Sequence, residues 1–181
     1  MTGRKLANEE LNRKTISDFR LAGKLPMVIV LDNVRSLNNI GSVFRTADAF
    51  LVNSIYLCGI TATPPHRDIQ KTALGATESV DWKYFDGTAG AVSELKSMNY
   101  EIICLEQTEA SIPLTGFQPD KHKKYAMVFG NEVKGVDQKI IDMSDSCIEI
   151  PQYGTKHSFN IAVSAGIVLW DFFTKLRPEG L

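Results

Sequence analysis

Short apolar runs alternate along the chain with segments of helical periodicity, and this alternation constrains the fold more than any other feature. Strands are expected at 27–32, 54–60, 79–85, 100–107, 125–130 and 146–150. Helices are expected at 39–50, 88–98, 137–143 and 158–176. Strands that alternate with helices are typical of an α/β fold, in which helices flank a mostly parallel sheet.

The chain is expected to divide into a polar N-terminal extension, residues 1–25, and an α/β domain, residues 26–181. The extension is expected to be helical, and six basic side chains outnumber three acidic ones there: Arg4, Lys5, Arg13, Lys14, Arg20 and Lys24 against Glu9, Glu10 and Asp18. This excess fits either a solvated helix or a contact with a polyanion. Within the domain, 61–79 is expected to be a loop that could hold a short helix, and 108–124 a long polar loop.

The composition is that of an ordinary globular domain, with 181 residues, 44% hydrophobic residues and a formal net charge of −1. Whole-chain charge gives no indication of nucleic-acid binding, so such a role needs a local patch. The three cysteines are far apart and odd in number, and are expected to be buried reduced thiols of a cytoplasmic protein. The sequence shows neither a signal peptide nor an apolar run long enough to span a membrane.

Three polar loops follow predicted strands, at 32–42, 131–135 and 151–160. Because ligands of parallel sheets bind outside the carboxyl ends of the strands, we expect these loops to form one site. Gly135 and Gly154 could instead serve only tight turns.

Familiar cofactor and catalytic signatures are missing from these loops. No G-x-G-x-x-G follows the first strand, and the glycine pair 130 and 135 lacks the Lys-Ser/Thr of a P-loop. The histidines are isolated from one another and from other ligand types, so no metal site is expected. Ser158 has no G-x-S-x-G context, which argues against a hydrolase nucleophile.

The three loops resemble the three motifs of the SpoU (TrmH) branch of the SPOUT methyltransferases. The first motif is NIGSVFRTA (39–47), with Asn39, Gly41 and Arg45 at the family spacing. The second is FGNEVKG (129–135), and the third is Ile150-Pro151, then Gly154, then SFN (158–160). The resemblance covers about residues 26–176. Phe159 stands where Leu is usual, and Gln152 where Met is common.

The resemblance implies a fold and an activity. It implies a C-terminal deep trefoil knot (the SPOUT fold) and a homodimer with the last helix in the interface. That helix offers more apolar surface than one buried face requires, at Ala162, Ala165, Leu169, Phe172, Phe173 and Leu176. The implied activity is transfer of a methyl group from S-adenosylmethionine to a ribose 2′-oxygen of RNA, either tRNA or rRNA, with tRNA favoured.

The resemblance also assigns residues. The cofactor would contact the chain around Leu105, Gly130, Ile150 and Phe159, where the glycine allows close approach. The catalytic centre would hold Asn39, Arg45, Glu132, Ser158 and Asn160. Glu132 could instead cap a helix that starts near Val136.

Arg45 is expected one helical turn after Gly41, where the loop ends, near a helix N-terminus that favours phosphate. Its pKa above about 12 makes a role as base demanding, so we favour phosphate binding and transition-state electrostatics over a base or a surface ion pair. Further phosphate contacts could come from other basic side chains: Arg35, His66, Arg67, Lys71, Lys121, Lys123, Lys124 and Lys156.

Two other functions remain open. One is a non-catalytic RNA- or S-adenosylmethionine-binding paralogue, against which the intact motif residues argue. The other is a SPOUT enzyme that methylates bases, against which the Ser-x-Asn of the third motif argues.

Overall fold

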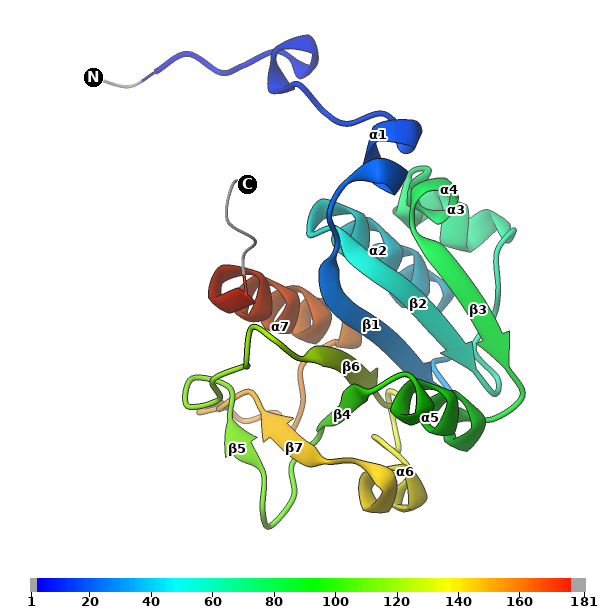
Figure 1. Cartoon of the computed structure of the whole chain (residues 1–181), viewed down its shortest axis with the longest axis vertical. Helices are drawn as coiled ribbons and strands as arrows, with labels where there is room; N and C mark the ends of the chain where they lie inside the picture. Colours follow the sequence, from blue (N-terminus) through cyan, green and yellow to red (C-terminus); the bar gives the residue numbers. More distant parts are fainter. Residues whose placement is uncertain (1–2, 177–181) are drawn as a thin grey trace.

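The computed structural model, which describes residues 3–176, contains one sheet with the strand order β3-β2-β1-β6-β4-β7-β5 (Figure 1). Every neighbouring pair of strands is parallel. The strands are β1 (Leu25–Asp32), β2 (Val52–Cys58), β3 (Asp81–Phe85), β4 (Tyr100–Leu105), β5 (Ile112–Pro113), β6 (Lys124–Phe129) and β7 (Ser146–Glu149). The expected α/β class is confirmed.

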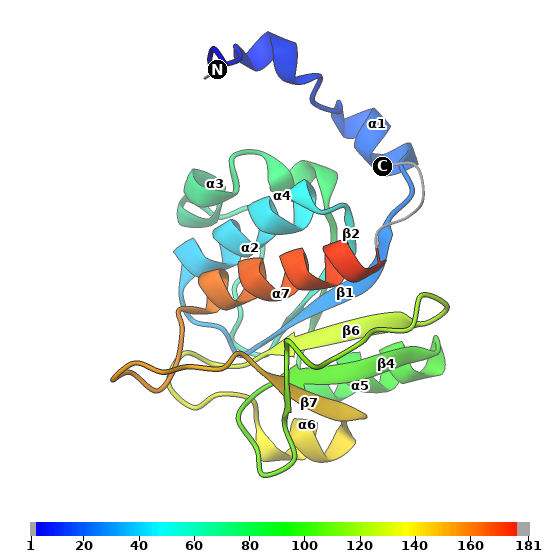
Figure 2. The same ribbon diagram turned by 90° about the vertical axis from the view of Figure 1, so that its left-hand side faces the viewer.

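Helices cover both faces of the sheet. The helical elements of the described residues are η1 (Asn8–Leu11), α1 (Ile16–Leu21), α2 (Leu37–Ala49), α3 (Arg67–Ala73), α4 (Ala76–Ser79), α5 (Thr88–Ser97), α6 (Gln138–Met143) and α7 (Ile161–Leu176). Figure 2 shows α2, α3, α4 and α7 on one face and α5 and α6 on the other. Side chains from β1 enter both cores, Ile29 and Leu31 on the α2–α7 side and Val30 on the α5 side. Burial on both faces explains why the strand runs are continuously apolar.

The sheet has its topological switch point between β1 and β6. The chain leaves β1 outward to β2 and β3, whereas β4, β7 and β5 lie beyond β6. The two central strands end side by side, with Leu31 paired to Phe129. In open parallel sheets, this is the place where a crevice for a ligand forms.

The three cysteines are free and buried, as expected. Burial raises the pKa of the Cys58 and Cys104 thiols to about 12, which disfavours the reactive thiolate form.

The N-terminal extension is less helical than expected. Between Gly3 and Lys24 only the short segments η1 and α1 are helical. Asn12 adopts a left-handed conformation that ends the first turn, and Thr15 caps α1 by accepting from the amide of Asp18. Figures 1 and 2 show the extension projecting from the body of the molecule.

Three other segments differ from expectation. Segment 61–79 holds both α3 and α4, separated by left-handed residues at Leu74 and Gly75. The polar loop 108–124 includes the edge strand β5, whose two residues gave too short an apolar signal to recognise. The last helix begins at Ile161 rather than 158, because Asn160 accepts a hydrogen bond from the amide of Ala162 and so starts it.

Gly41 lies inside α2 and does not end a loop, so that expectation is wrong. Ser36 caps the helix by accepting from the amide of Asn39, and the helix therefore starts earlier than expected. A Cβ at Gly41 would lie 2.1 Å from Thr72 Oγ1 and 2.3 Å from the Ile69 carbonyl oxygen. The glycine is needed because α3 packs directly against it.

We therefore predict that Gly41→Ala destabilises the fold by about 2 kcal/mol, since overpacking outweighs the higher helix propensity of alanine. The matched control is Gly90→Ala in α5, where the new Cβ would meet only Phe85 Cδ1, at 3.9 Å. Urea unfolding at one protein concentration compares the two variants. A Gly41→Ala protein as stable as Gly90→Ala would contradict the packing argument.

Candidate functional site

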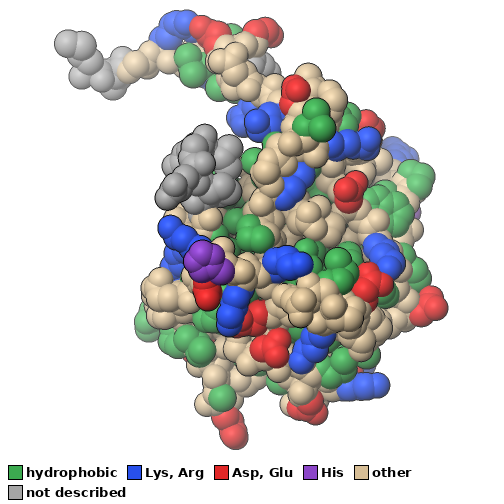
Figure 3. Space-filling view, in the orientation of Figure 1, with side chains coloured by type: hydrophobic (Ala, Val, Ile, Leu, Met, Phe, Trp, Pro, Cys, Tyr) green, Lys and Arg blue, Asp and Glu red, His purple; other side chains and the backbone are tan. Residues whose placement is uncertain are grey.

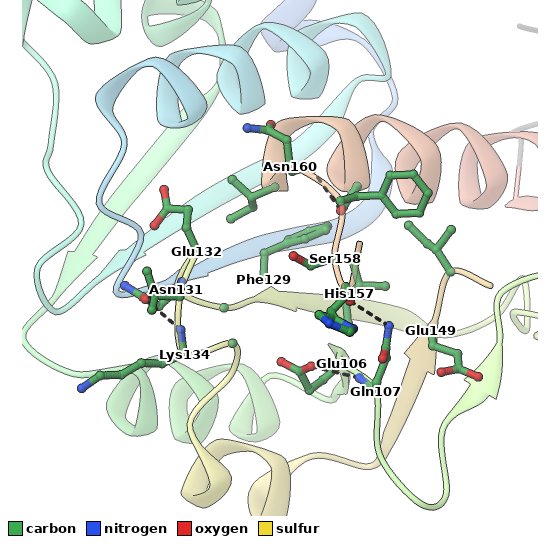
Figure 4. A pocket seen from close by; sticks show the side chains of 18 of the residues that line it. Glu106, Gln107, Phe129, Asn131, Glu132, Lys134, Glu149, His157, Ser158 and Asn160 are labelled. Carbon is green, nitrogen blue, oxygen red and sulfur yellow. Dashed lines mark hydrogen bonds between the residues drawn. The ribbon is translucent and has the colours of Figure 1, made fainter. Parts of the chain in front are cut away.

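A cavity of about 530 Å³ opens at the carboxyl ends of β4, β6 and β7 (Figure 4). It lies between the loops that follow these strands and the start of α7. The lining residues are Leu105, Glu106, Gln107, Phe129, Gly130, Asn131, Glu132, Val133, Lys134, Gly135, Glu149, Ile150, Gln152, His157, Ser158, Phe159, Asn160, Ile161 and Ser164. All four residues expected to bind the cofactor line this one cavity.

A chain of hydrogen bonds joins residues from all three sequence motifs beside the cavity. Asn160 Nδ2 donates to Asn39 Oδ1 at 3.1 Å, and Asn39 Nδ2 donates to Glu132 Oε1 at 3.2 Å. Glu132, Ser158 and Asn160 line the cavity. Asn39 does not line it and is connected to it only by its hydrogen bonds to Glu132 and Asn160. The structure therefore brings four of the five expected catalytic residues together.

The Glu132 carboxylate holds the segment that enters α2. Its Oε2 accepts from the amide of Arg35 at 3.0 Å, and its Oε1 accepts from the amide of Ser36 at 2.9 Å. Burial alone would raise the pKa of Glu132, but the hydrogen bonds from Arg35, Ser36 and Asn39 outweigh it and lower the pKa below its ordinary value. The alternative role as a cap of α6 is wrong, because Asp137 caps that helix through the amide of Lys139.

The loop from Gly130 to Val136 closes on itself. Asn131 and Gly135 exchange two main-chain hydrogen bonds of 2.9 Å, and Asn131 Oδ1 accepts from the amides of Val133 and Lys134. A Cβ at Gly130 would lie 2.1 Å from the Gly135 carbonyl carbon. Gly130 is therefore required by the fold of its own loop, and it also lines the cavity.

Several residues that organise these loops were not expected from the sequence. Asn131 Nδ2 donates to the Asn33 carbonyl at 2.7 Å and thereby ties the second loop to the first. Glu106 accepts from the amide of Val136 at 2.9 Å and fixes the far end of the second loop. Both side chains are polar residues directly after an apolar run, which is the signal that could have identified them.

Asp32 is a third such residue, at the carboxyl end of β1 and only 2% exposed. Its Oδ1 accepts from the Thr88 hydroxyl and from Asn33 Nδ2, and its Oδ2 accepts from the amide of Asp137 at 3.2 Å. One buried carboxylate therefore joins β1 to the starts of α5 and α6. Such a fully bonded buried group fixes the relative position of the elements it joins.

Arg45 lies outside the cavity, exposed on α2. Because α2 begins at Leu37, Arg45 is more than two turns into the helix and beyond the reach of its N-terminal dipole, so that expectation is wrong. Within residues 3–176, no ion pair or side-chain hydrogen bond engages the guanidinium. Arg45 lies six positions after Asn39 on α2, which corresponds to about 9 Å along the helix axis.

Other basic side chains are dispersed over the surface. Figure 3 shows Lys and Arg interspersed with acidic residues on one face. Two of the expected phosphate contacts have partners in the protein: Lys123 pairs with Glu101 at 2.7 Å, and Lys124 lies over the Tyr100 ring. His66 is engaged as the cap of α3 through Nδ1.

Residues 3–176 contain no group of three His, Cys, Asp or Glu side chains placed to hold a metal ion. No helix in the same part of the chain combines the length and apolarity needed to cross a bilayer.

Comparison with known proteins gives one family and several relatives. Residues 26–170 match the model of the SpoU rRNA Methylase family. The 23S rRNA (guanosine-2′-O-)-methyltransferase RlmB of Neisseria meningitidis serogroup B is 31% identical over 144 residues, 80% of this chain and 56% of its own. The tRNA (guanosine(18)-2′-O)-methyltransferase of Aquifex aeolicus is 28% identical over 156 residues, 86% of this chain and 72% of its own.

A solved structure has the same fold. The AdoMet-bound rRNA methyltransferase of Sinorhizobium meliloti superposes with a TM-score of 0.77 at 22% identity, covering 86% of this chain and 62% of that one. The present chain thus spans little more than half the length of the meningococcal relative and under two thirds of this structure.

We predict that Glu132→Gln lowers the free energy of unfolding at pH 7 by about 1 kcal/mol. Both carboxylate oxygens of Glu132 accept hydrogen bonds from backbone amides. In the glutamine variant one of these oxygens becomes an NH₂ group, which would face a backbone N–H and could not accept from it. Because the folded-state pKa of Glu132 lies below the unfolded value, the carboxylate stabilises the fold above about pH 4.5, and this contribution is lost as the pH falls through the folded pKa.

Urea unfolding of wild type and variant at pH 7 and below pH 4 measures this difference, which should shrink in acid. The control is Glu109→Gln, an exposed residue for which no side-chain hydrogen bond is seen in the described structure. Equal midpoints for wild type and Glu132→Gln at pH 7 would rule out the proposed anchoring role.

Proposed function

Since the chain belongs to the SpoU rRNA methylase family, we propose that it transfers a methyl group from S-adenosylmethionine to the 2′-oxygen of a ribose in RNA. The observation that carries the proposal is the hydrogen-bonded chain Asn160–Asn39–Glu132, which links the three motifs at the rim of one cavity. Relatives named as guanosine-2′-O-methyltransferases of rRNA and tRNA support the same chemistry. We favour tRNA as substrate and the cytoplasm as location.

The cavity suits S-adenosylmethionine in size and chemistry. Its volume lies in the range of small-molecule sites, and Leu105, Ile150 and Phe159 give it apolar walls. The side chains of Glu106, Glu132 and Glu149 also line it, and carboxylates suit a ligand that carries a sulfonium and an ammonium group. The bound cofactor supplies a methyl group already activated by the sulfonium, which requires no metal. The AdoMet-bound structure from S. meliloti supports this assignment.

The protein's own residues then have two tasks. Glu132, Asn39 and Asn160 fix the loops, so that the ribose hydroxyl approaches the methyl group along one direction. The Ser158 hydroxyl, at the cavity wall, is free to hydrogen-bond the ribose. The exposed guanidinium of Arg45, which lies outside the cavity, binds an RNA phosphate and from there adds positive potential as the 2′-oxygen becomes negative, while solvent accepts the proton.

We also propose that the protein is a homodimer through the outer face of α7. Of the apolar residues expected at the interface, Ala165, Leu169, Phe172 and Leu176 are buried in the protein's own core. The outer face instead exposes Val163 and Trp170, the latter 58% exposed. Phe173 is half-buried against Phe50, with ring centroids 5.4 Å apart. A second copy would cover this aromatic surface.

Two further expectations belong to this proposal. The first is that the C-terminal segment forms a knot. Contacts between α7 and the segment that connects β4 to β6 support this expectation. Lys175 Nζ donates to the carbonyls of Leu114 and Phe117, and the Phe117 and Phe172 rings stack at 5.6 Å. The second is that residues 26–181 are the methyltransferase domain, whereas 1–25 are an extension whose basic residues contact RNA.

Methyl transfer to RNA tests the function directly. Protein, methyl-labelled S-adenosylmethionine and bulk RNA from a strain lacking this gene are incubated with a chelator, and the RNA is then hydrolysed in alkali. Alkaline cleavage needs the free 2′-oxygen, so ribose methylation leaves the label in resistant dinucleotides. Label in mononucleotides would indicate a base methyltransferase, and absence of label a non-catalytic paralogue. Separating tRNA from rRNA identifies the substrate class.

We predict that Arg45→Ala lowers single-turnover methyl transfer about a hundredfold, as expected for loss of one preorganised electrostatic group. Its affinity for S-adenosylmethionine, measured by calorimetry, should stay within about threefold, or about 0.7 kcal/mol. Arg45→Lys recovers part of the rate if charge suffices, and little if the planar fork is needed. The control is Lys139→Ala on α6. Transfer by Arg45→Ala at the wild-type rate would exclude Arg45 from the reaction.

For the dimer, light scattering should give about twice the chain mass of 20.1 kDa. Trp170→Glu should give a monomer, because the dimer would otherwise bury an unpaired carboxylate. Trp82→Glu, at an exposed position of the edge strand β3, is the matched control and should remain dimeric. A monomeric wild-type protein with full activity would refute the proposed assembly.

A further inference from the structure

A second cavity, of about 410 Å³, lies beside the proposed cofactor cavity. The connection between β7 and α7 forms much of it, and five of its lining residues also line the first cavity. Gln107 and His157 belong to this shared wall. The two cavities are therefore neighbouring compartments of one larger site.

Tyr153 stands at the rim of the second cavity and is 96% exposed. Within residues 3–176 its ring makes no aromatic contact, and its hydroxyl makes no side-chain hydrogen bond. At 96% exposure, the side chain is almost entirely unpacked against the part of the chain that the structure describes. A large aromatic side chain at such a position is available to a binding partner.

The segment that carries Tyr153 is attached at both ends. It leaves the sheet at the end of β7, and Gln107 Nε2 donates to the His157 carbonyl at 3.3 Å before α7 begins. Figure 2 shows the segment between β7 and α7 projecting from the body of the molecule. Its two anchors keep the ring close to the cavity while leaving it open to a large ligand.

We propose that Tyr153 is a stacking platform for an unpaired nucleobase of the substrate RNA, and that Lys156 binds a neighbouring phosphate. Both residues line the second cavity, and both side chains are exposed. Every base offers a flat π-face to an aromatic ring, and lysine supplies a point charge to the backbone. The pair therefore matches the two components of a single-stranded nucleotide.

The base is unpaired because a duplex covers the faces of its bases, and RNA is commonly bound through bases splayed from loops and bulges. The inference rests on the proposed function, since the ribose to be methylated would sit by Ser158 at the adjoining cavity. Because the two cavities share a wall, a base next to that ribose would lie within reach of the second cavity. Stacking on Tyr153 would then favour RNA loops over RNA duplexes. The net charge of the protein provides no such discrimination.

Binding of a labelled single-stranded RNA of mixed sequence, measured by anisotropy, tests the inference without turnover. Tyr153→Ala should weaken this binding roughly tenfold, whereas Tyr153→Phe, which keeps the ring, should stay within about twofold. Binding of a matched RNA duplex should change little in either variant. Lys156→Ala should reduce the slope of log affinity against log salt by about one. The control is Trp82→Ala on β3.

Four results would overturn the inference. Equal binding of single-stranded RNA by Tyr153→Ala and wild type removes the platform, and equal losses in the Ala and Phe variants point to the hydroxyl. A calorimetric loss of S-adenosylmethionine affinity in Tyr153→Ala, or a change in mass by light scattering, would assign the ring to the cofactor or to a subunit contact. Failure of the proposed function is distinct, because it is absence of methyl transfer by the wild-type protein.

Discussion

The parallel pairing of β1 with β6 in the middle of the sheet is the constraint on which the site depends. Their register brings Leu31 beside Phe129, so that the loops after both strands begin at the same height. Only this adjacency lets Asn131 reach the Asn33 carbonyl and Glu132 reach the amides of Arg35 and Ser36. Motifs nearly 100 residues apart in sequence become one surface because two central strands are neighbours.

Hydrogen bonds within the protein hold the first two polar loops, those that follow β1 and β6. Asp32 accepts from three donors, and Asn131 uses both its amide oxygen and its amide nitrogen. Buried or half-buried polar groups cost free energy unless they are bonded, and a fully bonded network is rigid. The cavity walls are thus built before a ligand arrives, which reduces the ordering that binding would require.

The sequence predicted the α/β class, most strands to within two residues, and seven of the residues that line the cavity: Leu105, Gly130, Glu132, Ile150, Ser158, Phe159 and Asn160. These depended on apolar periodicity and on motif spacing, both of which are local. It failed where long-range contacts decide the outcome. Gly41 was expected to end a loop, but its neighbour is α3, which no local pattern reveals. The role of Glu132 at α2 likewise needed the position of Arg35, 97 residues away.

The strand order also sets the order in which the protein can be completed on the ribosome. While β2 can join β1 as soon as it emerges, the other edge of β1 has no partner until β6, about 100 residues later, has been made. During that interval an apolar strand edge, later the centre of the sheet, is open to pairing with other chains. The nascent protein therefore passes through a stage at which a chaperone that covers strand edges would protect it, although the finished fold needs no such help.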